Sequence, residues 1–127
     1  MKTAKDFNFD FGHIGIWHEK AEEAKEVADK LSDWFGFDVE EVPYAYHIDN
    51  NHFEILKEPG RGEKGHFSIL CDDIEGAKAY LESKGVVFDE NTCHYTEDGQ
   101  LWKVFAHDAI SGFDWHLALR GKASNGH

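Results

Sequence analysis

The sequence predicts an α+β fold made of two similar halves, and three observations support this prediction. A short phrase occurs twice, as Gly-His-Ile-Gly-Ile at residues 12–16 and as Gly-His-Phe-Ser-Ile at residues 65–69. Each copy is followed by a helix-like stretch that ends at a glycine, and then by several strand-like runs. The order strand, helix, three strands therefore occurs twice, in modules of about residues 7–58 and 65–120.

The first module changes its hydrophobic period twice. Residues 7–18 alternate as a strand does, and residues 19–35 then place apolar side chains at helical spacing. Residues 38–57 contain valine, tyrosine and isoleucine, interrupted by Pro43 and by the turn sequence Asp-Asn-Asn at 49–51. This pattern predicts two or three short strands, with the proline at a sheet edge or a bulge.

The second module follows a glycine-rich linker at residues 58–65. A strand is expected at residues 65–71 and a helix from about residue 73 to 84, with Asp73 able to cap its start and Gly85 its end. Residues 97–100 form a hairpin-turn sequence. The remaining strand-like runs are residues 86–88, 92–96, 101–107 and 113–119.

Composition limits the possible classes of function. A chain of 127 residues fits one domain. Its formal net charge of −12 argues against nucleic acid and membrane partners. No secretory signal or membrane span is recognised, so we expect a cytoplasmic protein, with Cys71 and Cys93 as free thiols. Residues from Gly121 onward are expected to form a polar tail.

Four side chains of the metal-ligand type share the less apolar face of the strands that open and close the modules: His13, Glu54, His66 and His116. Each lies opposite its apolar sequence neighbours, because alternate residues of a strand point to opposite faces. Modules of this size cannot bury their apolar faces alone, so the halves should pair. Three imidazoles and a carboxylate suit a divalent Zn, Ni, Fe or Mn ion. The alternative is that the histidines hydrogen-bond within the sheet and Glu54 is solvated.

Further residues are candidates for substrate binding: Trp17, Tyr44, Tyr46 and His52. Trp17 has the strand parity of His13 and could cover the mouth of the site. Tyr44 and Tyr46 should share a face, where they would line the site or pack in the core. His52 has the parity of Glu54 and could orient a ligand or the substrate. The sequence identifies no catalytic base.

The repeat and its four residues resemble the vicinal oxygen chelate superfamily, which includes glyoxalase I, extradiol dioxygenases, and the fosfomycin- and bleomycin-resistance proteins. The resemblance covers roughly residues 7–120. In that family, paired modules form a cupped mixed sheet, and the first and last strands of each module supply the metal ligands. The matching positions are His13, Glu54, His66 and His116. Residues 105–112 also resemble the family's Asp-Pro-x-Gly turn, with Asp108 and Gly112 kept and Ala109 in place of the proline.

The resemblance implies a glyoxalase-like, metal-dependent lyase or isomerase that acts on a small oxo-acid or another substrate with vicinal oxygens. Two alternatives remain. One is a non-catalytic small-molecule binding or resistance protein, and the other is an extradiol-type dioxygenase in which iron leaves His116 free. The last ligand is usually a glutamate in the metal-dependent isomerases, and here it is His116.

The resemblance carries two narrower expectations. The motifs look most like the small domains associated with 2-keto-3-deoxy-6-phosphogluconate-type aldolases. Small members of the superfamily commonly pair their modules across a two-fold axis, which predicts a homodimer. In such a dimer, His13 and Glu54 of one chain would face His66 and His116 of the other.

Overall fold

The structure is a computed structural model that describes residues 2–122. Met1 and residues 123–127 lie outside the described residues, and with them most of the predicted polar tail. The first module contains β1 (Asp10–Ile16), α1 (Ala21–Phe35), β2 (Val39–Val42), β3 (Ala45–Ile48) and β4 (Phe53–Leu56). The second contains β5 (His66–Cys71), α2 (Ile74–Ser83), β6 (His94–Tyr95), β7 (Leu101–Phe105) and β8 (Asp114–Leu119). Short 3-10 helices occur at Ala4–Phe7 and Glu90–Thr92, and the predicted order of elements is confirmed.

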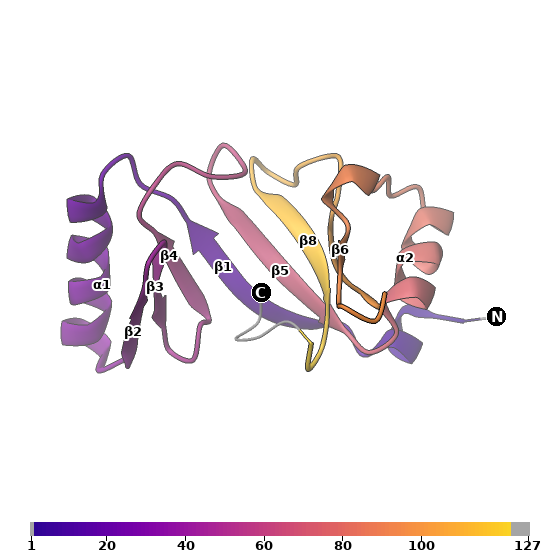
Figure 1. The fold of residues 1–127 in the computed structure, drawn as a ribbon, viewed down its shortest axis with the longest axis horizontal. Coiled ribbons are helices and arrows are strands. Elements are labelled where there is room, and N and C mark those ends of the chain that lie inside the picture. Colours follow the sequence, from indigo (N-terminus) through magenta and orange to yellow (C-terminus); the bar gives the residue numbers. More distant parts are fainter. Residues whose placement is uncertain (1, 123–127) are drawn as a thin grey trace.

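All eight strands belong to one mixed sheet, in the order β2-β3-β4-β1-β5-β8-β7-β6. The two modules meet where β1 pairs antiparallel with β5. Within each module the last strand returns beside the first, because β4 runs parallel to β1 and β8 runs parallel to β5. The four strands that carry the predicted ligands are therefore neighbours at the centre of the sheet (Figure 1).

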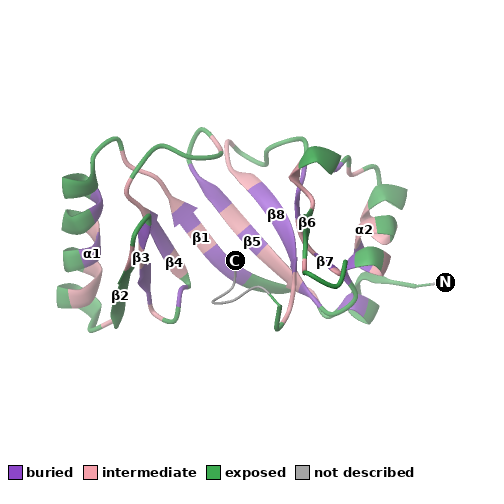
Figure 2. Cartoon of the chain, in the orientation of Figure 1, coloured by how far each residue is buried: buried purple, intermediate pink, exposed green. Residues whose placement is uncertain are grey.

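The helices lie at opposite ends of the molecule (Figure 1). Helix α1 packs Ala24 and Ala28 against Ile48 and Ile55 of the sheet, and its other side is exposed (Figure 2). It ends at Gly36, whose φ of 72° is the left-handed conformation that glycine adopts readily at helix ends. Each helix thus covers the apolar face of its own module and leaves the opposite face of the sheet to polar side chains.

Helix α2 begins as predicted, with the Asp73 side chain accepting a hydrogen bond of 3.1 Å from the Gly76 N–H. It buries Ile74 and Ala77 in a cluster that includes Trp115 and Leu117 of β8. Since Trp115 and Leu117 flank His116 in sequence, the packing of α2 directs His116 to the other face of the sheet.

Two of the predicted strand runs are shorter in the structure. Residues 86–88 contribute only an isolated bridge between Phe88 and Ala106. The run predicted at residues 92–96 is reduced to β6 (His94–Tyr95), because Thr92 ends the 3-10 helix Glu90–Thr92. The Asp89 side chain accepts a hydrogen bond from the Asn91 N–H, which favours this turn over an extended chain.

Smaller expectations of the first module are also tested. Pro43 lies in the turn between β2 and β3, beside the edge strand of the sheet. Residues 49–51 form the predicted turn, and all three have left-handed φ values between 55° and 58°. Cys71 and Cys93 are free thiols, and burial raises the pKa of Cys71 to about 12. Among the described residues no helix is long and apolar enough to cross a membrane.

One row of paired residues crosses the sheet from its β2 edge to its centre. Glu40 pairs with His47, and His47 pairs with Glu54. Glu54 then pairs with Gly15, and Gly15 pairs with His66. This register brings residues from five strands and both modules into line on the sheet.

The α2 packing gives a test of the fold. Truncating Ile74, which is 1% exposed, by an Ile74→Ala change should lower the free energy of unfolding by about 2–5 kcal/mol, because a cavity replaces packed side chain. Val87 is 58% exposed, and Val87→Ala should change the free energy of unfolding by less than about 0.5 kcal/mol. Urea denaturation measures both, and equal losses would contradict the packing described here.

Candidate metal centre

Three buried histidines from three adjacent central strands converge on one point. His13 comes from β1, His66 from β5 and His116 from β8, and one ring nitrogen of each lies within 4.8 Å of the others. The Nε2 atoms of His13 and His66 are 3.1 Å apart. Antiparallel pairing of β1 with β5 and parallel pairing of β5 with β8 produce this convergence.

Glu54 of β4 adds a carboxylate to the same point. Its Oε1 atom lies 3.4 Å from His66 Nε2 and 3.8 Å from His13 Nε2. Glu54 is 3% exposed, so its charge is removed from water and requires a compensating partner. The structure therefore brings all four sequence-predicted ligands together.

The donor atoms fit a divalent cation. Two donors bound at about 2.1 Å to one ion lie roughly 3.0–3.4 Å apart at tetrahedral or octahedral angles. The 3.1 Å and 3.4 Å separations from His66 Nε2 fall in this range, and the 3.8 Å between Glu54 Oε1 and His13 Nε2 is slightly longer. In addition, the buried Nδ1 atom of His116 has no hydrogen-bond partner among the described residues, which leaves a nitrogen available to a cation.

Burial lowers the pKa of His116 well below its ordinary value, and the neighbouring His13, His66 and Lys103 lower it further. Burial disfavours the charged imidazolium because the surroundings solvate charge poorly. A neutral imidazole keeps the lone pair that binds a metal. His116 is thus held in the ligating form at neutral pH.

Gly15 makes room for His66. A Cβ atom added at Gly15 would overlap the His66 ring and lie only 2.6 Å from both ring nitrogens. The imidazole therefore lies directly over the Gly15 backbone, and this position lets it reach Glu54 and His13. Any side chain at residue 15 would displace His66 from the cluster.

A cavity of about 400 Å³ opens onto the cluster. Its lining residues are Tyr44, Glu54, His66, Trp102, Lys103, Phe105 and His116. Sequence reasoning missed Trp102, Lys103 and Phe105 of β7. The signal that could have found them is Lys103, a charged residue in the middle of the otherwise apolar run Leu101–Phe105.

The two tyrosines separate, so their predicted shared face is wrong. Tyr44 lines the cavity, whereas Tyr46 packs against the apolar cluster beneath α1, with Lys57 Nζ 4.9 Å from its ring centroid. Tyr44 lies in the turn before β3, where strand alternation no longer applies.

The other two predicted substrate contacts lie outside the cavity lining. The Trp17 indole N–H donates a 2.7 Å hydrogen bond to the Gly62 carbonyl and so holds the linker. The side chain of His52 is 51% exposed and lies 3.2 Å from Asp49. His52 belongs to the turn before β4, so its predicted parity with Glu54 does not hold. The structure instead buries His47, whose Nε2 lies 3.7 Å from Glu54 Oε2.

The linker is fixed to both modules. Besides the Trp17 contact, the Lys64 N–H donates to the Gly112 carbonyl at 2.9 Å, and Arg61 Nε lies 3.5 Å from Asp114 Oδ2. The expectation of a site shared between subunits stays a prediction, since the structure contains one chain. All four ligands converge within a single chain, because the linker folds back and lets β1 pair with β5 directly.

Gly15 provides a first test of the site. Gly15→Ala should preserve the far-UV circular dichroism but lower the affinity for Zn²⁺ by at least about tenfold, because His66 is displaced. Gly60→Ala is the control, since a Cβ there would make an ordinary 3.7 Å contact with Leu56. Zn²⁺ titration against a chromophoric chelator measures both. Unchanged affinity in Gly15→Ala would show that the position of His66 does not matter.

The lowered pKa of His116 predicts an acid sensitivity of the metal-free protein. Its unfolded pKa is about 6.5. Because the folded pKa is lower, the unfolded state binds more protons below that pH. The stability contributed by the neutral ring is fully present above about pH 6.5 and decreases as the pH falls. Urea denaturation in EDTA between pH 5 and 8 should show that the free energy of unfolding decreases as the pH falls. In His116→Gln the slope of the free energy of unfolding against pH should be smaller. The exposed His94 supplies the control His94→Ala, and a slope equal to wild type in His116→Gln would refute the prediction.

Comparison with known proteins concerns the fold. No protein-family model matches the chain, and no curated protein matches it in sequence. A methylmalonyl-CoA epimerase in complex with methylmalonyl-CoA and NH4+ matches with TM-score 0.56 and 18% identity, over 90% of this chain and 96% of that one. A variant of the Streptomyces coelicolor methylmalonyl-CoA epimerase in complex with 2-nitronate-propionyl-CoA matches with TM-score 0.55 and 17% identity, over 89% and 95%.

A hypothetical protein from Bacillus halodurans C-125 also matches, with TM-score 0.54 and 18% identity over 88% of this chain and 94% of that one. The narrower resemblance to aldolase-associated domains finds no support among these structures. At such identities the similarity establishes the architecture only. The chain has the glyoxalase-like fold that the resemblance to the vicinal oxygen chelate superfamily implied.

Proposed function

We propose that this protein is a metal-dependent enzyme of the isomerase or lyase type that acts on a small oxo-acid or another substrate with vicinal oxygens. One observation carries the proposal. Three buried histidines and one buried carboxylate converge where a cavity of about 400 Å³ opens. A hydrogen bond between His13 and His66 would satisfy only part of this group, whereas a cation would bind all four side chains and remain accessible to a substrate.

The ligand set determines the charge of the site. A divalent ion held by His13, Glu54, His66 and His116 would act as a Lewis acid that stabilises negative charge on substrate oxygens. Glu54 is the single carboxylate in the set, so the loaded centre would keep about one positive charge. This charge favours anionic substrates, such as those that carry a carboxylate beside a carbonyl.

Lys103 is the candidate proton carrier. It lines the cavity together with His66 and His116, and its Nζ lies 5.2 Å and 5.8 Å from the ring centroids of Trp102 and Phe105. Burial lowers the pKa of Lys103, so a larger fraction of its side chain is the neutral amine at physiological pH than for an exposed lysine. A neutral amine can accept a proton from a substrate carbon next to a carbonyl and return it.

Two further side chains near the site are candidates for contact with a substrate. The Arg61 guanidinium carbon lies 4.1 Å from the Phe105 ring centroid, and Phe105 lines the cavity. Tyr44 lines the cavity as well, and we assign it to substrate contact. The structurally similar epimerase was determined with methylmalonyl-CoA, in which a carboxylate and a thioester carbonyl flank one carbon. A compound of that type would offer this site two oxygens and an acidic C–H.

The alternatives are less well supported. The extradiol dioxygenase hypothesis leaves His116 free, but a ring nitrogen of His116 lies within the histidine cluster. A non-catalytic binding protein would not require several buried ligand-type side chains around one point. Homodimer formation remains part of the proposal, although the ligand set needs no second chain.

The proposal is tested by metal analysis and hydrogen exchange. Protein stripped with EDTA and reloaded with Zn²⁺, Ni²⁺, Fe²⁺ or Mn²⁺ should exchange the acidic proton of methylmalonyl-CoA, or of the hemithioacetal of methylglyoxal, for deuterium in D2O. Mass spectrometry measures the exchange. His13→Ala should lose both metal and exchange. Lys103→Met should keep the metal and lose about 10²–10⁴-fold in rate.

His94→Ala is the control and should behave as wild type, because His94 is exposed on β6. Failure of wild type to take up any of the four metals would reject the enzyme proposal. Metal uptake without exchange of either probe would support the binding-protein alternative.

A further inference from the structure

We propose that His47 is a positioning residue of the metal centre. It holds the Glu54 carboxylate in its ligand orientation, and Glu40 holds His47 from the other side. This inference rests on the proposed function, because it assigns a role to residues that surround the same four ligands. The inference connects Glu40 of β2, His47 of β3 and Glu54 of β4. Of these three residues, the resemblance implied a role only for Glu54.

The two oxygens of Glu54 face different partners. Oε1 lies 3.4 Å from His66 Nε2 and 3.8 Å from His13 Nε2, on the side of the cluster. Oε2 lies 3.7 Å from His47 Nε2, within range of an electrostatic contact but beyond direct hydrogen-bond distance. A carboxylate with one oxygen toward a cation site and the other toward a histidine cannot rotate without losing one of these contacts. His47 thereby restricts Glu54 to an orientation in which Oε1 faces the site.

Sheet register determines where His47 lies. His47 pairs with Glu54 between β3 and β4, and Glu40 pairs with His47 between β2 and β3. Directly paired residues have side chains close together on the same face of the sheet. His47 is 4% exposed, so little water competes for its contact with Glu54. The electrostatic interaction of the imidazole with the carboxylate is therefore screened less by water than it would be at the surface.

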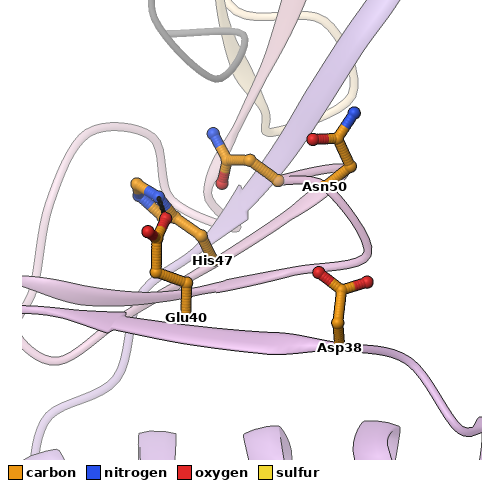
Figure 3. A pocket seen from close by; sticks show the side chains of 5 residues that line it. Asp38, Glu40, His47 and Asn50 are labelled. Atoms are coloured by element: carbon orange, nitrogen blue, oxygen red, sulfur yellow. Dashed lines mark ion pairs between the residues drawn. The ribbon is translucent and has the colours of Figure 1, made fainter.

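Glu40 completes the arrangement from a second, polar cavity. This cavity, of about 290 Å³, is lined by Asp38, Glu40, His47, Asn50 and Asn51. Figure 3 shows the Glu40 carboxylate beside the His47 ring, and its Oε1 lies 3.8 Å from His47 Nδ1. The ring therefore has a carboxylate at each nitrogen, one facing the solvent and one facing the metal centre. Ligands in metalloproteins are commonly oriented by such outer partners, and loss of a partner weakens metal binding about 10–100-fold.

Neighbouring residues provide matched controls. Glu41 follows Glu40 on β2 but pairs with Lys57 at 2.7 Å, so its carboxylate is engaged away from His47. Glu40→Gln and Glu41→Gln remove the same charge from adjacent positions. His47→Gln keeps an amide N–H that can face Glu54, whereas His47→Ala removes the partner altogether.

The test uses Co²⁺ as the probe, because its visible absorption reports the number and arrangement of its ligands. His47→Ala should bind Co²⁺ about 10–100-fold more weakly than wild type and show an altered visible spectrum. His47→Gln should recover most of the affinity and the wild-type spectrum. Glu40→Gln should weaken binding by a smaller factor, and Glu41→Gln should match wild type. Circular dichroism checks that each variant is folded.

The outcomes are distinguishable. If the folded His47 variants both bind Co²⁺ with wild-type affinity and spectrum, His47 does not position Glu54 and the inference is overturned while the metal centre stands. A lower melting temperature without a change in affinity or spectrum indicates a merely structural role and also overturns it. If wild type itself binds no Co²⁺, the metal centre is absent, and the proposed function fails together with this inference.

Discussion

The pairing of β1 with β5 is the constraint on which the candidate site depends. It joins the two modules, and it stacks the His66 ring over the bare backbone of Gly15. That contact places His66 within 3.1 Å of His13 and 3.4 Å of Glu54, so ligands of both modules meet. Parallel return of β4 and β8 then adds the remaining ligand of each module. The order of the strands, their register and the lack of a side chain at Gly15 together produce the cluster.

Sequence patterns predicted the parts of the structure that depend on local periodicity. Helical spacing of apolar residues predicted both helices, and alternation inside strands predicted the common face of His13, Glu54, His66 and His116. The structure brings these four side chains together. Alternation fails beyond strand ends, which is why the shared face of Tyr44 and Tyr46 and the shared parity of His52 and Glu54 were predicted wrongly. It also cannot give the order of strands in a sheet. The contact between His47 and Glu54 depends on that order and was therefore missed.

The charge of the site differs from that of the molecule. The chain carries a formal charge of −12, which opposes the approach of anions. Salt screens exposed charges beyond about 8 Å at physiological ionic strength, so distant surface carboxylates contribute little inside the cavity. Lys103 lies within the cavity wall, and the Arg61 guanidinium lies against the ring of Phe105, another lining residue. The cavity lining combines Lys103 with the Glu54 carboxylate, so it is a divalent ion at the histidine cluster that would give the site its positive charge.

The linker between the modules influences whether the two modules pair within one chain or between two copies of the chain. Contacts of Trp17 with Gly62, of Lys64 with Gly112 and of Arg61 with Asp114 hold it in a folded-back path. Two copies could exchange modules only if the linker extended, and extension would break all three contacts in each chain. Domain swapping, which would rebuild the same sheet between two chains, would therefore require these three contacts to be remade in a different linker path. A dimer that kept the β1–β5 pairing within each chain would have to form through other surfaces of the protein.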